Sequence, residues 1–220
     1  DGGDGAGADP AGDDAAGPAV SEAVPALVIG AGPAGLMAAE TLAAAGVPVV
    51  LAEAMPTPAR KFLMAGKSGL NLTRDEPAAA FAARIAGGGA HAEGYLNQKD
   101  LQAIVAGFGP AEVRDWAEGL GIALFAGSTG RVFPVGMKAS PLLRAWLARL
   151  GAAGVELRTR WRWQGFAGDG LRFATPEGVR ALRPAVTVLA LGAALAALVA
   201  HLAVRLGHGF DGGPPHSPQA

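Results

Sequence analysis

Residues 26–53 read ALVIGAGPAGLMAAETLAAAGVPVVLAE, two short apolar runs separated by a glycine-rich turn and a segment of helix-forming residues. The apolar runs at 26–30 and 47–53 predict strands, and the segment 34–46 between them predicts a helix. Both runs are continuously apolar rather than alternating, which is typical of strands covered on both faces of a parallel sheet. The stretch therefore predicts a β–α–β unit of an α/β fold.

The turn inside this unit has the pattern GxGxxG, placed directly after the first strand and at the start of the helix. Gly30 permits a tight turn, Gly32 lets a pyrophosphate approach the backbone, and Gly35 lets the helix pack closely on the strand. Pro33 and Ala34 open the helix, where unpaired N–H groups and the helix dipole favour phosphate. The pattern predicts a phosphate-binding turn.

An acidic residue, Glu53, ends the second strand eighteen residues after Gly35. A carboxylate at this place can accept hydrogen bonds from both hydroxyls of an adenosine ribose, and it would repel a 2′-phosphate. Strand, turn, helix, second strand and acid together predict an adenine-dinucleotide site. These residues alone leave open whether the dinucleotide is FAD or NAD.

Composition narrows the classes of function. The net charge of −1 disfavours nucleic-acid binding, because no basic field is present. The chain has no Cys, which excludes disulfides, thiolate metal ligands, a Cys nucleophile and a redox-active dithiol. The His residues are scattered, so we expect no metal site. Any redox chemistry must come from a cofactor.

The first 25 residues carry six acidic residues, no basic residue and almost no large apolar side chain. Such a segment cannot offset the entropy of ordering, so we expect residues 1–25 to be a disordered acidic tail rich in Ala and Gly. It lacks the features of a secretory signal or a mitochondrial transit peptide, which predicts a cytoplasmic protein.

One apolar stretch, residues 184–200, is long enough to be weighed as a membrane span. It is shorter than the roughly 20 residues that a spanning helix needs. Its first part, 186–191, suits a buried strand, and the spacing of Leu195, Leu198 and Leu202 suits a helix. We therefore expect a strand followed by a helix, and no membrane partner.

The middle of the chain is expected to be irregular over 54–77, mostly helical to Leu120, and helical again over 141–150. Three or four short strands then follow up to Gly192. Within them, Trp161 and Trp163 alternate with Arg160 and Arg162, which is typical of a half-buried strand with both Trp side chains on one face.

Three separated blocks carry a resemblance to a known family: residues 26–53, RKFLMAGKSGLNLT at 60–73, and GRVFPVGMKASPLLRAWLARL at 130–150. Together they resemble the HI0933-like family of FAD-dependent flavoproteins, over about Ala26 to Gly192. The resemblance implies a Rossmann-like FAD-binding domain of the glutathione-reductase type, with a parallel sheet and a small antiparallel β meander.

The resemblance also implies roles for particular residues. The three motif glycines and Glu53 would hold the ADP half of FAD, and a basic loop would follow the pyrophosphate toward the flavin. The residues of that loop are Arg60, Lys61, Gly66, Asn71 and Thr73. Gly192, at the end of a strand that resembles the one beside FAD in this fold, is a further candidate.

The chain departs from the family in two places. Ala59 stands where relatives usually have Gly before the Arg-Lys pair, and after Gly192 the residues no longer follow the family pattern. We therefore expect 26–192 to be the N-terminal part of the FAD-binding domain and 193–220 to be a divergent tail. The resemblance then implies a domain that is incomplete at its C-terminus.

The leading hypothesis is a flavoprotein oxidoreductase that passes a hydride through FAD between a small-molecule substrate and a second reactant such as NAD(P)H. One alternative is a truncated dinucleotide-binding module without catalysis. Another is an NAD-dependent Rossmann dehydrogenase. No catalytic residue and no oligomeric state can be predicted from these residues.

Overall fold

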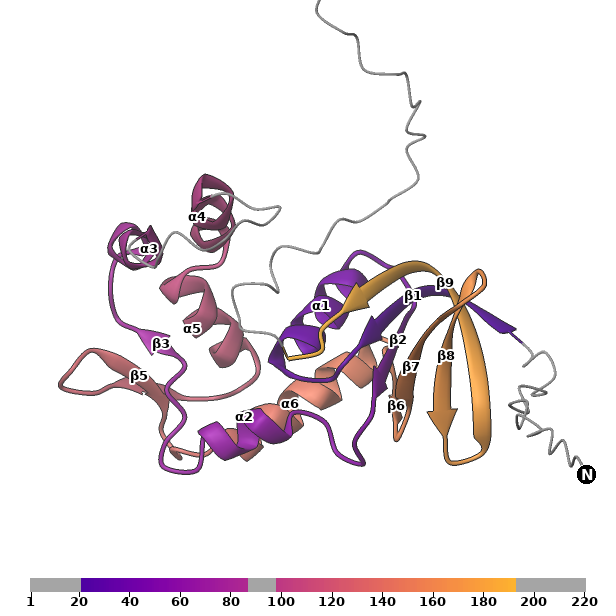
Figure 1. Cartoon of the computed structure of the whole chain (residues 1–220). Helices are drawn as coiled ribbons and strands as arrows, with labels where there is room; N and C mark the ends of the chain where they lie inside the picture. Colours follow the sequence, from indigo (N-terminus) through magenta and orange to yellow (C-terminus); the bar gives the residue numbers. More distant parts are fainter. Residues whose placement is uncertain (1–20, 87–97, 193–220) are drawn as a thin grey trace, which may run out of the picture.

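The computed structural model describes residues 21–86 and 98–192, and its centre is a six-stranded sheet (Figure 1). The strand order is β6-β2-β1-β9-β8-β7. Four of these strands pair in parallel: β1 (Ser21–Ile29), β2 (Val49–Glu53), β6 (Glu156–Thr159) and β9 (Gly178–Leu189). The predicted β–α–β unit of a parallel sheet is confirmed.

The remaining strands of the sheet form an antiparallel meander. β7 (Arg162–Ala167) pairs with β8 (Gly170–Thr175), and β8 pairs with the first half of β9. β9 therefore belongs to both halves, because its second half lies parallel to β1. Pro184 fits inside this strand because the pairing with β8 ends at Leu182, so no neighbour on that side needs its missing N–H. The small antiparallel meander is also confirmed.

β1 begins at Ser21, so the expected boundary of the N-terminal tail at residue 25 is placed too late. The segment Ser21–Val24 pairs with residues 181–184 of β9. Hydrogen-bonded pairing with the long strand β9 fixes these residues, although they have little apolar surface. The pattern of apolar residues therefore could not predict where β1 begins. Residues 1–20 of the expected tail and the expected tail 193–220 lie outside the described residues.

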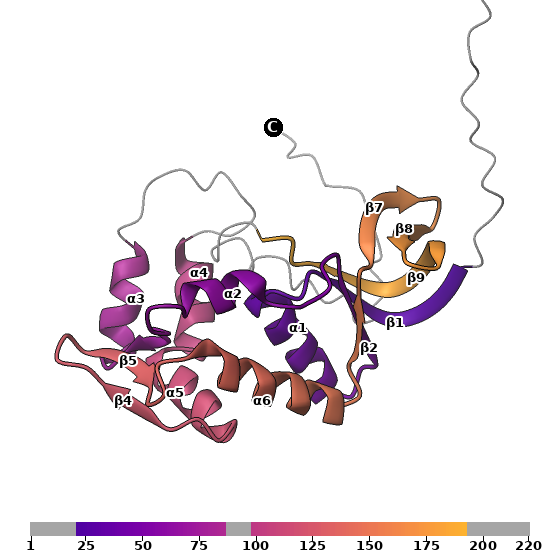
Figure 2. The ribbon, with the colours of Figure 1, turned by 90° about the horizontal axis from the view of Figure 1, so that it is seen from below.

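Helices cover one face of the parallel strands, and Figure 2 shows α1 and α6 side by side there. These are α1 (Pro33–Ala44), α6 (Ala139–Ala152) and the short α2 (Arg60–Ala65). The main core forms between them and the sheet, around Leu36, Leu51 and Leu142, each fully buried. A second core cluster, centred on Leu27, Phe173 and Leu182, lies between the other face and the meander.

A smaller subdomain lies at the end of the molecule opposite the meander (Figures 1 and 2). Its sheet has the order β3-β5-β4, all antiparallel. Its elements are β3 (Thr73–Arg74), α3 (Ala78–Ala86), α4 (Gln98–Gly107), α5 (Pro110–Gly119), β4 (Leu124–Ala126) and β5 (Arg131–Pro134).

Candidate functional site

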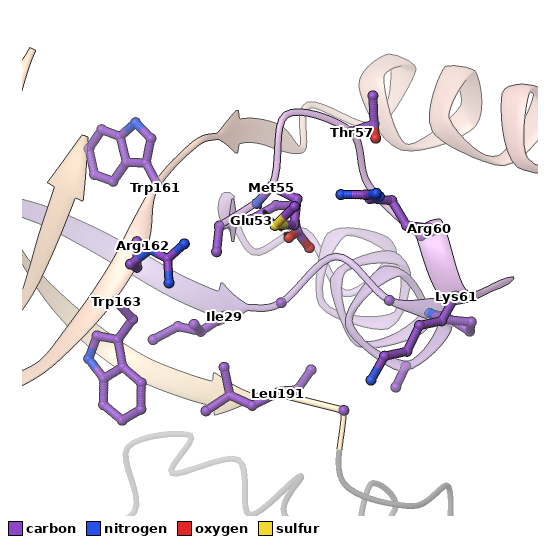
Figure 3. A pocket seen from close by; sticks show the side chains of 18 of the residues that line it. Ile29, Glu53, Met55, Thr57, Arg60, Lys61, Trp161, Arg162, Trp163 and Leu191 are labelled. Carbon is purple, nitrogen blue, oxygen red and sulfur yellow. Dashed lines mark hydrogen bonds between the residues drawn. The ribbon is translucent and has the colours of Figure 1, made fainter. Parts of the chain in front are cut away.

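A cleft of about 570 Å³ lies at the carboxyl ends of β1, β2 and β9. Its walls come from the glycine-rich turn, the loop after β2, the start of α2, the start of β7 and the residues after β9 (Figure 3). In open α/β sheets, ligands bind in the crevice at this edge. The fold thus places the predicted nucleotide motif at the edge where such a site is expected.

Two glycines of the motif are required by close packing. Gly30 has φ +101°, and a Cβ there would lie 2.3 Å from the carbonyl oxygen of Ala190. A Cβ on Gly35 would lie 1.8 Å from the carbonyl oxygen of Gly30. Both distances are far below van der Waals contact, so Gly30 lets the turn after β1 lie against Ala190, and Gly35 lets α1 lie against that turn.

The third glycine, Gly32, faces open space. No atom lies within 4 Å of the position that its Cβ would occupy, and the residue lines the cleft. α1 starts at the next residue, Pro33, and Ala34 also lines the cleft. The first N–H groups of a helix have no partner within it, so this end offers donors and a positive dipole end to an anion.

Glu53, the last residue of β2, is held at the cleft by two backbone N–H groups. Its Oε2 accepts a hydrogen bond from Ala31 at 2.9 Å, and its Oε1 accepts one from Met55 at 2.8 Å. A carboxylate oxygen can accept more than one hydrogen bond. Each oxygen therefore retains capacity for a ribose hydroxyl while the two N–H groups fix the carboxylate beside the turn.

Two basic side chains begin α2 at the opposite side of the glycine turn. Ala59 precedes them in a left-handed conformation with φ +53°, and its N–H donates to the carbonyl of Ala31 at 2.8 Å. This bond ties the start of α2 to the nucleotide motif, and Arg60 and Lys61 both line the cleft. Gly192 lines it too, with φ +88°, and the Lys61 Nζ lies 3.6 Å from its Cβ position.

Three residues named by the family resemblance lie elsewhere. Gly66 ends α2 and packs on α6, because a Cβ there would lie 2.6 Å from the Cβ of Ala139. Asn71 is exposed and Thr73 lies in β3, and none of the three lines the cleft. Their contact with a cofactor stays a prediction.

The cleft also contains residues that were not predicted as site residues. Trp161, Arg162 and Trp163 line it from the start of β7, and Met64 and Leu191 are exposed apolar side chains at its edge. The alternation of Trp and Arg indicated a strand, but no local pattern shows that this strand crosses near the end of β2.

Within residues 21–86 and 98–192, no group of three or more His, Cys, Asp or Glu side chains is arranged to hold a metal ion. Among the helices of the same residues, none has the length and apolar character needed to cross a membrane.

Solved structures share the fold at low sequence identity. A flavocytochrome c3 fumarate reductase in its open conformation is 24% identical with TM-score 0.60, covering 80% of this chain and 34% of that chain. An E. coli quinol fumarate reductase is 17% identical with TM-score 0.61, covering 79% and 33%. A 3-ketosteroid dehydrogenase from Rhodococcus jostii RHA1 is 15% identical with TM-score 0.56, covering 76% and 45%. The chain therefore spans less than half the length of these structures.

No curated protein matches the sequence. The family model of the HI0933-like protein Rossmann domain does match, over residues 24–200, which is most of the chain. The glycine-rich turn and Glu53 lie within the matched residues. The chain therefore belongs to the HI0933-like family.

Proposed function

We propose that this chain binds FAD through the ADP half of the cofactor and forms the cofactor-binding part of a flavoprotein oxidoreductase. The observation that carries the proposal is the placement of Glu53, whose carboxylate is held beside the glycine turn by the N–H groups of Ala31 and Met55. A carboxylate fixed beside a phosphate-binding turn suits an adenosine ribose with free 2′- and 3′-hydroxyls.

The residues present fit this cofactor. The empty space at Gly32 leaves room for a pyrophosphate against the backbone, since no atom lies within 4 Å of its Cβ position. Arg60 and Lys61 line the same cleft and can neutralise phosphate charge. The structures named above include a flavocytochrome and a dehydrogenase, which supports the same class of chemistry.

Each group has a separate task in this proposal. The N-terminus of α1 binds the pyrophosphate, the two cations of α2 orient it, and Glu53 fixes the ribose. Bound FAD supplies the uptake and release of a hydride. The proposal includes a small organic molecule as substrate and NADH or NADPH as the source of electrons, in a cytoplasmic protein.

The test is a set of titrations with FAD, NAD, ADP and ADP carrying a 2′-phosphate, followed by calorimetry. We expect FAD to bind more tightly than NAD, and ADP to bind at least about tenfold more tightly than its 2′-phosphorylated form, because Glu53 repels the added charge. Glu53→Gln should weaken FAD binding and reduce this discrimination.

Glu118→Gln, on an exposed side chain of α5, is the control and should change neither affinity. NAD binding tighter than FAD binding would contradict the proposal and favour an NAD-dependent dehydrogenase. Flavin binding without reduction by NADH or NADPH would refute only the proposed electron donor.

A further inference from the structure

Trp161 and Trp163 are both fixed on the side of β7 that faces the second core cluster. The Trp161 ring lies 5.6 Å from the Phe173 ring, measured between centroids. The Trp163 ring lies 5.3 Å from that of Phe166, and its Nε1 donates to the carbonyl of Gly165 at 3.0 Å. Because side chains alternate along a strand, the residue between the two tryptophans must point the other way.

That residue is Arg162, and it points into the cleft (Figure 3). Its backbone position is set by the end of β2, since the N–H of Trp161 donates to the carbonyl of Glu53 at 2.9 Å and that of Arg160 to the carbonyl of Met55 at 3.2 Å. These bonds keep the start of β7 next to the end of β2. Figure 3 shows Arg162 on the side of Glu53 away from Arg60 and Lys61.

The Arg162 guanidinium is available for a ligand. Its side chain is exposed, and the part of the chain described by the structure shows no ion pair and no hydrogen bond from it. Arg158, four residues earlier, differs: its guanidinium bonds Glu22 and Glu156. Among the described residues, the planar guanidinium of Arg162 therefore has no bonding partner. It lies at the end of the open cleft opposite the glycine-rich turn.

We propose that Arg162 is a specificity-determining residue whose guanidinium stacks on the adenine ring of the bound dinucleotide. The inference rests on the proposed function, which puts the pyrophosphate at Gly32 and the ribose at Glu53. The base is attached to the ribose on the side away from the phosphates, and the cleft continues in that direction to Arg162. A planar guanidinium stacks on aromatic faces. Trp161 and Trp163 also line the cleft, but their rings are held against Phe173 and Phe166.

The experiment measures the dissociation constants of FAD, ADP and UDP for the whole chain and for Arg162→Gln. The substitution should lower the affinities for FAD and ADP by about tenfold, which corresponds to the loss of one stacked cation. The affinity for UDP should fall by a smaller factor, because the pyrimidine ring of UDP offers a smaller stacking surface. The ratio of the ADP and UDP dissociation constants is the decisive measurement. It would not change on substitution if Arg162 only supported the fold or only attracted the phosphates by its charge.

Arg172→Gln is the matched control, since Arg172 is exposed on β8 and lies outside the cleft. It should alter none of the three constants. Arg162→Lys keeps the charge without the plane and should bind FAD less tightly than the unchanged chain. If Arg162→Gln proves to be less stable than the unchanged chain, Arg162→Lys is used in its place to compare the affinities for ADP and UDP.

Equal affinity for FAD in the unchanged chain and in both variants would overturn the role of Arg162 and leave the proposed function standing. Equal weakening of ADP and UDP would overturn stacking in favour of simple charge attraction. An unchanged chain that binds neither FAD nor ADP would overturn the proposed function, and this inference with it.

Discussion

Arg160 connects the two ends of the sheet in a backbone conformation that favours glycine. Its φ is +59°, between β6 and β7, and its side chain is exposed. The strain of a left-handed residue is held by the hydrogen bonds on either side of it, from Arg160 to Met55 and from Trp161 to Glu53. A residue that forms no part of the cleft therefore holds the strand that carries Arg162.

Arg160→Gly should stabilise the folded chain by about 0.5 kcal/mol, because relief of left-handed strain exceeds the added entropy of the unfolded chain. Arg144→Gly is the control with the opposite sign: Arg144 is exposed within α6, where glycine costs about 1 kcal/mol. Urea unfolding measures both. If Arg160→Gly destabilised the folded chain, Arg160 would not be strained in its left-handed conformation.

Glu22 and Arg158 form a bidentate ion pair, with N–O distances of 2.8 and 2.7 Å. Hydrogen bonds from Arg158, and to a lesser extent its charge, lower the pKa of Glu22 from the ordinary value of 4.5. A carboxyl with a lowered pKa in the folded state stabilises that state above its unfolded pKa and loses this contribution as the pH falls through its folded pKa.

The unchanged chain should thus be more stable than Glu22→Gln at neutral pH, by at most about 1 kcal/mol because the Glu22 side chain is half exposed and solvent screens the pair. The difference should shrink below pH 4.5, the ordinary pKa of Glu22, and vanish in stronger acid. Urea unfolding of both chains across this pH range measures it. A difference that stays constant with pH would rule out the ion pair as its source.

At Ala59, the sequence alone gave a hint of the backbone conformation. The family resemblance implies glycine there, and the structure has a left-handed φ of +53°, a conformation that favours glycine. Gly66 shows the opposite case: its place in a basic loop indicated contact with a cofactor, but its observed neighbour is Ala139 of α6. Sequence reveals that a glycine is present, whereas only the fold reveals what lies against it.

At the scale of elements, one carboxylate joins three helices. Glu40 on α1 accepts hydrogen bonds at Oε2 from the Nε1 of Trp116 on α5, at 3.2 Å, and of Trp146 on α6, at 2.6 Å. The two indoles meet edge to face, with centroids 4.7 Å apart. A guanidinium nitrogen of Arg149 lies 2.9 Å from Oε1, although it is not aligned for a hydrogen bond.

Glu40→Ala should destabilise the folded chain by about 2 kcal/mol, because two part-buried indole N–H groups lose their acceptor and the Arg149 guanidinium loses its ion-pair partner. Glu40→Gln should cost less, since its amide oxygen still accepts. Glu118→Ala, on an exposed face of α5, is the control and should lie within about 0.5 kcal/mol of zero. The measurement is chemical unfolding followed by tryptophan fluorescence. Equal stability of Glu40→Ala and the control would show that the cluster contributes nothing.

Elements with a strong local pattern could be predicted. α1 and α6 lie where apolar spacing and proline and glycine punctuation indicated, and β8 and β9 begin at the expected Gly-containing turns. The break between β6 and β7 at Arg160 was not expected, because it contains no glycine. The bounds of β1 could not be predicted, because its first residues are fixed by pairing with β9 rather than by their own apolarity. Glu40 could not be identified either, since its partners are 76 and 106 residues away.

At the scale of the whole molecule, the site depends on the path of the chain between two sheet edges. β6 and β7 are consecutive in sequence but lie at opposite ends of the strand order. The connection passes the carboxyl ends of β2 and β1, which brings Arg162 to the cleft (Figure 3). Local patterns predicted the glycine turn and Glu53 as parts of the site. They could not predict that Arg162 lies at the same cleft, because strand order is a property of the whole sheet.

In the proposed function, the cleft beside Gly32 holds the ADP half of FAD. The most direct test of this placement is the flavin absorbance retained after FAD incubation and desalting, by the unchanged chain, Gly32→Val and Gly151→Val. No atom lies within 4 Å of the Cβ position at either glycine, so both variants should fold; only Gly32 lines the cleft.

We expect the unchanged chain and Gly151→Val to retain flavin. Gly32→Val should bind FAD on the order of tenfold to a hundredfold more weakly, because its side chain would fill the place of the pyrophosphate. Equal flavin retention by all three chains would show that the cleft beside Gly32 does not hold FAD.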